Sequence, residues 1–230
     1  MKKGGVIKEK IKMLRGNHKV LLYWGYKIAN LLKQNVLNNG ERYDPNIMKK
    51  FNINDPDQEE RYRLAQTFLS KDDDVLDIAC GTGYGTLILM ERCHRVMGVD
   101  ISKKSIRYAN KNYRVSNNIE FVQADILNFN NPADVVVSFE TIEHVKGEIK
   151  DVVLKLISLA RKRLVCSVPY MEPPGSNKHH VHFNINEDTF GFIGSDYQIE
   201  LLYQSRDGKI CRDKRDDVLT LIVVINRKVK

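Results

Sequence analysis

A glycine-rich loop is the first stretch of this sequence whose residue types and spacing could do chemistry. It reads V-L-D-I-A-C-G-T-G-Y-G over residues 75–85, with glycines at 81, 83 and 85. Glycines between a strand and a helix let backbone N–H groups approach a ligand closely, near the positive end of the helix. The third glycine of a dinucleotide loop would stand where Thr86 lies, so the pattern argues against a nicotinamide cofactor.

Three aspartates at the ends of apolar runs define the ligand more closely. Asp77 precedes the glycines, Asp100 ends the run M-G-V-D, and Asp125 follows E-F-V-Q-A. The first carboxylate would repel a pyrophosphate and attract an ammonium group. The second, about 20 residues after the loop, can accept both hydroxyls of a ribose, and the third suits an adenine amino group. Together these groups describe S-adenosylmethionine, with S-adenosylhomocysteine as the product.

Two later segments carry acids and histidines. The run F-E-T-I-E-H-V contains Glu140, Glu143 and His144, and the loop V-P-Y-M-E-P-P-G-S-N-K-H-H-V-H-F contains His179, His180 and His182. Spacing of i, i+3 and i+4 would put the first three on one face if a helical turn begins there. Ligands of open α/β sheets bind beyond the carboxyl ends of the strands, so both segments should face the acceptor.

Two chemical uses of these side chains remain open. In the first, Glu140 contacts the acceptor and His144 acts as a general base that removes a proton from an acceptor hydroxyl. In the second, a divalent cation lowers the pKa of that hydroxyl. Its ligands would be Glu140, Glu143, His144 and His180.

The elements that must position these residues alternate along the chain. Apolar runs at 75–79, 95–99, 119–122, 134–139 and 163–168 are separated by helical patterns, which predicts βαβ units and a parallel sheet covered on both faces. Runs at 197–203 and 218–226 are joined without a helix and must pair antiparallel. We expect a Rossmann-like α/β three-layer sandwich. Its sheet should be seven-stranded and mostly parallel, and the family resemblance described below implies the order 3-2-1-4-5-7-6 with the last strand antiparallel.

Chain length and composition indicate the domain organisation and the cellular location of the protein. The chain of 230 residues is predicted to form an N-terminal helical extension, 1–54, and one domain, 55–230. Val20, Trp24, Ile28, Leu31 and Leu32 recur at helical spacing within the extension. Because we find no run long enough to span a membrane and no paired cysteine motif, we expect a cytoplasmic protein with reduced thiols. The net charge of +8 favours solubility, with an anionic partner such as nucleic acid as the alternative.

From about residue 56 to 204 the sequence resembles the class I S-adenosylmethionine-dependent methyltransferases. The matching motifs are V-L-D-I-A-C-G-T-G-Y-G, V-M-G-V-D-I-S, F-V-Q-A-D-I and D-V-V-V-S-F-E-T-I-E-H-V. By this resemblance Asp77, Gly81 and Gly83 hold the methionyl part, Asp100 the ribose, Ile101 a face of the adenine, and Asp125 with Ile126 its edge. The expected cofactor contacts also include Ala79, Cys80 and Glu140.

Two subfamilies share further features with the chain. E-x-x-E-H with a histidine-bearing loop resembles small-RNA 3′-terminal ribose 2′-O-methyltransferases, whose metal is held by two Glu and two His. G-E-R-Y-x-P at 40–45, E-E-R-Y, S-V-P and L-L-Y-Q resemble methyltransferases found with surface-glycan and sugar-modifying enzymes. The second resemblance spans more of the chain. It implies O-methylation of a sugar, glycan or related small-molecule hydroxyl, and the alternatives are an RNA ribose methyltransferase with a metal or a non-catalytic adenosylmethionine-binding subunit.

Overall fold

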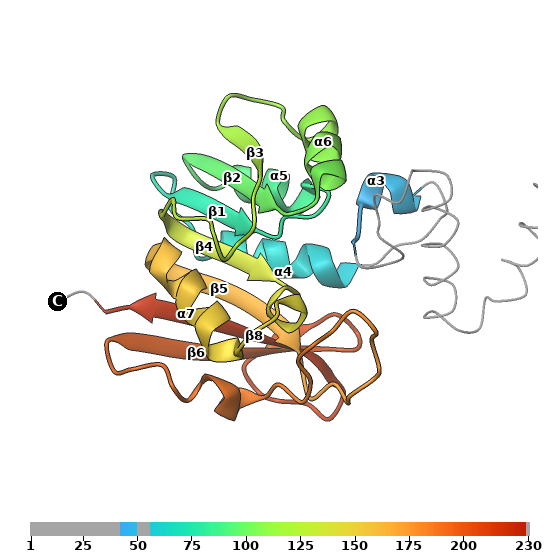
Figure 1. The fold of residues 1–230 in the computed structure, drawn as a ribbon, viewed down its shortest axis with the longest axis vertical. Helices are drawn as coiled ribbons and strands as arrows, with labels where there is room; N and C mark the ends of the chain where they lie inside the picture. Colours follow the sequence, from blue (N-terminus) through green and yellow to red (C-terminus); the bar gives the residue numbers. More distant parts are fainter. Residues whose placement is uncertain (1–41, 50–55, 229–230) are drawn as a thin grey trace, which may run out of the picture. The chain divides into compact units, whose positions relative to one another are not determined.

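Eight strands form one sheet with the order β3-β2-β1-β4-β5-β8-β6-β7, which can be followed from β3 to β6 in Figure 1. The parallel strands are β1 (Asp74–Ile78), β2 (Arg95–Asp100), β3 (Ile119–Gln123), β4 (Ala133–Phe139) and β5 (Ala160–Pro169). Strand β8 (Val218–Arg227) runs antiparallel to both of its neighbours, β5 and β6 (Tyr197–Ser205), so β6 runs in the same direction as β5. The predicted fold class, strand order and antiparallel end are confirmed.

The prediction of seven strands was one short. Strand β7 (Ile210–Cys211) pairs with Tyr203 and Gln204 of β6. It lies inside the charged connection between β6 and β8, and two residues are too few to show the alternation that identifies a strand in a sequence.

The computed structural model of the protein describes residues 42–49 and 56–228. The chain divides into two compact units, Met1–Asp55 and Pro56–Lys230. In the first unit, α3 (Pro45–Met48) begins after Asp44, whose carboxylate accepts a hydrogen bond from the N–H of Ile47 at 2.9 Å. The amphipathic stretch predicted over residues 20–32 lies outside the described residues. Within the described ranges, no helix is long and apolar enough to cross a membrane.

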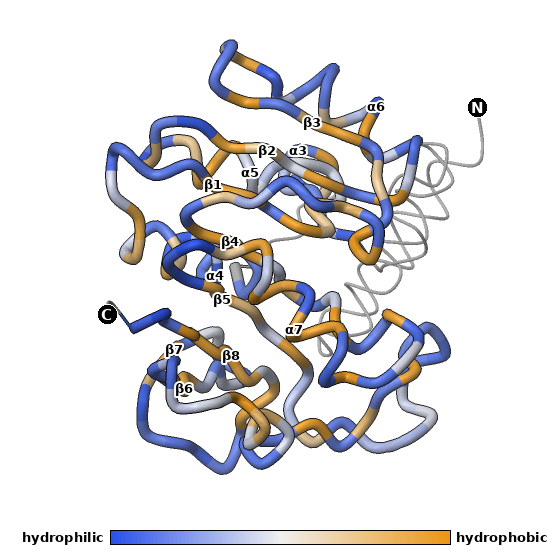
Figure 2. The backbone as a smooth tube through the Cα atoms, turned by 60° about the vertical axis from the view of Figure 1, so that its left-hand side comes forward, coloured by the Kyte–Doolittle hydropathy of each residue, from blue (hydrophilic) through white to orange (hydrophobic). Residues whose placement is uncertain are grey.

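Successive residues of the central strands alternate between the two faces of the sheet. Leu76, Val136, Leu164 and Val223 lie in one buried cluster with α7 (Ile149–Leu159). The strand order reverses direction between β1 and β4, so right-handed crossovers put α5 (Tyr84–Met90) and α6 (Lys103–Asn112) on the face opposite α7. Figure 2 shows the strands as largely hydrophobic segments and the connecting loops as hydrophilic ones. This is the three-layer arrangement that the apolar runs predict.

Strand β5 begins earlier than predicted, at Ala160 rather than Arg163, because α7 ends at Leu159 with no intervening turn. Over this start, β5 has one residue more than the part of β4 with which it pairs. Ala133 lies opposite Ala160 and Val135 opposite Arg163, so two steps on β4 face three on β5, a bulge. Helix α4 (Pro56–Gln66) precedes β1.

Candidate cofactor and acceptor site

The predicted cofactor residues gather at the carboxyl ends of β1, β2 and β3. The turn after β1 contains left-handed residues at Ala79 (φ 60°), Gly81 (φ 56°) and Gly83 (φ 90°). Gly83 is the N-cap of α5, and a Cβ there would lie 2.7 Å from both Ala109 and Phe121. The turn therefore needs glycine at 83 for its backbone conformation and for its packing.

Ala79 and Cys80 differ in what they offer to a ligand. Ala79 is exposed at the open edge of the sheet, and Gly81 is half-buried. Cys80 is buried, and its N–H donates to the carbonyl of Val99 on β2 at 3.0 Å. A ligand at this edge would therefore meet Ala79 and the backbone of the glycine turn before it met the thiol.

Asp77 lies beneath the loop instead of at its surface. It is fully buried, and it accepts hydrogen bonds from Thr86 Oγ1 at 2.5 Å and from Tyr62 Oη at 3.3 Å. Burial raises the pKa of the Asp77 carboxyl to about 7, against the opposing effect of the bonds from Thr86 and Tyr62. The structure thus gives Asp77 a role in holding the loop, and its direct contact with an ammonium group stays a prediction.

Because the pKa of Asp77 is raised on folding, the free energy of unfolding should fall as pH rises from about 4 to about 7. The native state holds the proton over this range, whereas the unfolded chain releases it. We expect Asp77→Asn to remove this dependence, by up to about 4 kcal/mol. Urea unfolding of both proteins at several pH values measures the difference. Parallel pH profiles for the two proteins would show that Asp77 is ionised throughout.

Asp100 links the second strand to the glycine turn. Its Oδ2 accepts from the N–H of Gly81 at 3.0 Å, and its Oδ1 accepts from the N–H of Ser102 at 2.7 Å. The next residue, Ile101, leaves 65% of its surface exposed, which is unusual for an isoleucine beside a buried carboxylate. A nucleoside whose ribose lies at Asp100 would cover this side chain.

The third strand contributes a second apolar and acidic edge. Asp125 Oδ1 accepts from the N–H of Leu127 at 2.9 Å, and Asp125 is half-buried. Ile126 packs against the core, whereas Leu127 is 46% exposed. Of the predicted adenine residues, Ile126 is partly buried against the core, whereas its exposed neighbour Leu127 was not predicted.

On the acceptor side, the prediction that Glu140, Glu143 and His144 share one helical face was wrong. Glu140 has a left-handed backbone (φ 48°), and the short 3-10 helix begins only at Ile142 (η3, Ile142–His144). Glu140 Oε1 instead accepts from Ser167 Oγ on β5 at 2.8 Å. The turn at Glu140 places its carboxylate against Ser167 on β5.

A buried arginine of α4 also approaches Glu140. Arg61 is 5% exposed, and its Nη1 lies 3.9 Å from Glu140 Oε1 and donates to Gln204 Oε1 at 2.8 Å. The neighbouring α4 residue, Tyr62, is the one that bonds Asp77. Helix α4 thus contacts both the cofactor loop and the acceptor segment through adjacent residues. Both side chains lie in the motif E-E-R-Y, whose residues were not predicted to have a role in the site.

Glu143, His144 and His180 come together, and each offers a ligand atom within 4.8 Å of the others. Glu143 is fully buried, and neither of its carboxylate oxygens has a hydrogen-bond partner among the described residues. Burial, and next the nearby Glu140, hold the pKa of Glu143 well above its usual range. A buried, unpaired carboxylate is costly, so this position calls for a proton or a cation.

Backbone and side-chain contacts orient the two histidines. His144 Nδ1 lies 3.1 Å from the carbonyl of His179, so Nδ1 carries the proton, and Nε2 lies 3.8 Å from Glu143 Oε1. His180 Nδ1 bonds Glu172, and its Nε2 lies 2.9 Å from Asn177 Nδ2. Glu172 is thus a second acidic group of this cluster, and it was not among the predicted site residues.

The other two loop histidines have structural contacts. His182 Nε2 donates to the carbonyl of Val145 at 2.8 Å, and the N–H of Val181 donates to the carbonyl of Glu143 at 2.8 Å. His179 contributes its carbonyl to His144. These bonds hold the histidine-bearing loop against the η3 turn, so both acceptor segments form one structure.

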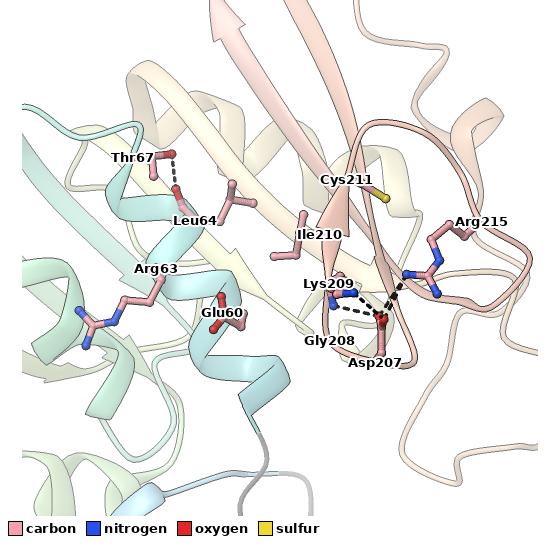
Figure 3. Close-up of a pocket in the computed structure, with 10 residues that line it drawn as sticks. All are labelled: Glu60, Arg63, Leu64, Thr67, Asp207, Gly208, Lys209, Ile210, Cys211 and Arg215. Carbon is pink, nitrogen blue, oxygen red and sulfur yellow. Dashed lines mark hydrogen bonds and ion pairs between the residues drawn. The ribbon is translucent and has the colours of Figure 1, made fainter.

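A cavity of about 810 Å³ lies elsewhere in the same unit, between α4 and the connection from β6 to β8 (Figure 3). Leu64 and Ile210 provide apolar surface in it. Its cations are neutralised locally, because Arg63 pairs with Glu91 and Arg215 pairs with Asp207. It is lined by none of the residues predicted for cofactor or acceptor, and its lining is Glu60, Arg63, Leu64, Thr67, Asp207, Gly208, Lys209, Ile210, Cys211 and Arg215.

The central part of the chain is similar to known proteins. Residues 75–162 match the family described as methyltransferase domain. The chain is 35% identical over 92 residues to the malonyl-[acyl-carrier protein] O-methyltransferase of Acetivibrio thermocellus, covering 37% of this chain and 32% of that protein. It is 30% identical over 142 residues to the YqeM protein of Bacillus subtilis, covering 58% and 54%. The chain therefore spans about a third and about half of these two relatives.

Solved structures show the same fold. The N-methyltransferase NodS from Bradyrhizobium japonicum, in complex with S-adenosyl-L-homocysteine, superimposes with a TM-score of 0.59 at 17% identity. The match covers 76% of this chain and 89% of NodS. The protein thus has the Rossmann-like α/β fold of this methyltransferase structure, and residues 75–162 are similar to the methyltransferase domain family.

Proposed function

We propose that this chain, with its methyltransferase domain at residues 75–162, is an S-adenosylmethionine-dependent methyltransferase that O-methylates a hydroxyl of a sugar, glycan or related small molecule. We further propose that residues 55–230 form the catalytic domain and that residues 1–54 are an extension to it. The acceptor class rests on the sequence resemblance to sugar-modifying methyltransferases. The cofactor rests in addition on the geometry of the sheet edge.

One observation carries the cofactor assignment. At the carboxyl ends of β2 and β3, two exposed aliphatic side chains, Ile101 and Leu127, lie next to two aspartates, Asp100 and Asp125. Exposed apolar surface between hydrogen-bond acceptors suits a nucleoside, whose base is flat and apolar and whose ribose and amino groups are donors. The residues present therefore fit adenosylmethionine.

The proposed roles follow from the contacts. The backbone of Gly81 and Gly83 would hold the methionyl part, Asp100 the ribose, and Ile101, Asp125 and Ile126 the adenine. Bound adenosylmethionine supplies an already activated methyl group. His144 would take the proton of the acceptor hydroxyl at Nε2, and the nearby Glu143 would stabilise the resulting imidazolium. Glu140, held by Ser167 and Arg61, would position the acceptor.

Titration calorimetry with adenosylhomocysteine, followed by a panel of sugars and nucleotide sugars, tests this proposal. We expect micromolar or tighter binding of adenosylhomocysteine and its release from adenosylmethionine with at least one sugar acceptor. Binding without release for any acceptor would favour a non-catalytic subunit. Tight binding of a nicotinamide or flavin, with no binding of adenosylhomocysteine, would refute the assignment.

A second candidate function, an RNA ribose 2′-O-methyltransferase with a divalent metal, is favoured by the buried Glu143 carboxylate. Its oxygens lack hydrogen-bond partners among the described residues, and the ligand atoms of His144 and His180 lie close by. A carboxylate with two imidazoles suits several divalent metals, which would there lower the pKa of a bound hydroxyl. Glu140 was predicted as a fourth ligand, but it does not belong to the group of ligand atoms within 4.8 Å.

If a metal binds here, Glu143→Gln should weaken the binding of Mn²⁺ or Zn²⁺ by more than about tenfold, because it removes the anionic ligand and even the loss of an outer-shell partner costs that much. Glu140→Gln is the matched control, since Glu140 bonds Ser167 instead. Calorimetric titration of each metal into wild type and both variants makes the comparison. Equal weakening by the two substitutions would restore Glu140 to the ligand set. Absence of binding by the wild type would remove this candidate.

A further inference from the structure

Helix α6 carries a stripe of cations on its outward face. Lys103, Lys104, Arg107 and Lys111 are exposed, and so is Arg114 just beyond the end of the helix. None of these five side chains forms an ion pair with any residue in the described ranges. Elsewhere on the second unit several exposed cations have acidic partners, as Arg95 does in Asp74. The α6 stripe is therefore a concentration of uncompensated positive charge.

The cations form a row along the helix axis. Lys103, Arg107 and Lys111 follow each other at i, i+4 and i+8, which places them on one face over a rise of about 12 Å. The opposite face is buried through Ser105, Ile106 and Ala109. The row thus points away from the sheet.

This arrangement works against the stability of the helix. Like charges at i, i+4 repel each other, and lysines in the first turn oppose the helix dipole. The helix sequence K-K-S-I-R-Y-A-N-K-N contains no acidic residue. The nearest preceding carboxylate, Asp100, accepts backbone bonds from Gly81 and Ser102. An anionic partner would relieve a repulsion that the described residues leave in place.

We propose that the α6 stripe binds a linear phosphodiester chain. A row of single cations at regular spacing complements a row of single negative charges, and such contacts act through charge without reading sequence. A bilayer surface would also need apolar side chains next to the cations to insert. Beside the stripe in the described residues, Val115 (67% exposed) and Ile101 (65% exposed) are the large apolar side chains at the surface, and we assign Ile101 to the cofactor. The chain could be a nucleic acid or a phosphodiester-linked polyol, which present the same charges. The proposal does not depend on methyl transfer.

Fluorescence anisotropy with labelled probes tests the stripe. The probes are an oligouridylate of about a dozen nucleotides and a poly(glycerol phosphate) of similar length. The test variant is the triple substitution K103E/R107E/K111E. The control is R92E/K146E/R206E, which changes the net charge equally at three exposed cations on other segments, none of them ion-paired within the described ranges. Because the full chain is used, its lysine-rich N-terminus is the same in every protein.

We expect the stripe variant to bind at least one probe about 100-fold more weakly than wild type, and the control to lose much less. The slope of log affinity against log salt should become shallower by about 2, because about three phosphate contacts are lost. Binding of the oligouridylate alone would identify nucleic acid, and binding of poly(glycerol phosphate) would identify a polyol chain. Equal losses in both variants would overturn the proposal. So would binding only to anionic phosphatidylglycerol vesicles, or to none of the probes.

Thermal unfolding separates a binding defect from a folding defect. Since the substitutions remove like-charge repulsion and place acids in the first turn of α6, the stripe variant should be at least as stable as wild type. If it is less stable, K103Q/R107Q/K111Q repeats the binding test without reversing the charge. Unchanged probe binding by that variant would also refute the proposal that the α6 stripe binds a phosphodiester chain.

Discussion

Asp100→Ala is expected to weaken the binding of adenosylhomocysteine by about 100-fold or more. The carboxylate holds the glycine turn through the N–H of Gly81 and the start of α6 through the N–H of Ser102, and we propose that it also accepts the ribose hydroxyls. Hydrogen bonds to a charged group contribute about 1.5–3 kcal/mol each, so the loss of the ribose contacts alone corresponds to roughly this factor. Calorimetric titration measures the change.

The exposed Asp72 provides the control, because its side chain lies away from the cofactor edge. Asp72→Ala should bind adenosylhomocysteine as wild type does. Thermal unfolding of Asp100→Ala shows whether the turn has collapsed. A folded Asp100→Ala protein that keeps wild-type affinity would place the ribose elsewhere and would contradict the proposed cofactor geometry.

His144→Ala should reduce turnover by about 100-fold to 10,000-fold, the usual contribution of a general base. His144 Nε2 faces the buried Glu143, and the bond from Nδ1 to the His179 carbonyl fixes its orientation. Affinity for adenosylhomocysteine should stay within about twofold of wild type, because His144 is not among the proposed cofactor contacts. The measurement is release of adenosylhomocysteine with an acceptor identified from the sugar panel.

Two further measurements separate the possible roles of His144. His94→Ala removes an exposed histidine and should leave turnover unchanged. A chelator should not affect wild-type turnover if His144 acts as a base, whereas it should abolish turnover if His144 is a metal ligand. Wild-type turnover by His144→Ala would eliminate both roles and would direct attention to Glu140 or Glu172.

The sequence alone determined the main architecture and the edge of the sheet where the predicted cofactor residues gather. Continuous apolar runs identified buried parallel strands, and a connection without a helix identified the antiparallel end. The glycines at 81 and 83 identified the turn, and Asp100 and Asp125 stand at or just after the ends of their strands. These features could be predicted because periodicity, glycine and connection length act locally along the chain.

The tertiary structure decided which side chains meet. Asp77 accepts hydrogen bonds from Tyr62 and Thr86 beneath the loop. Glu140 lies against Ser167 and Arg61. Glu143 is left with His144 and His180. None of this follows from spacing, because a left-handed residue at 140 and a helix packed from residues 56–66 change the partners of a carboxylate without changing its place in the sequence. Contacts between distant segments depend on packing of the whole domain, which local residue patterns do not encode.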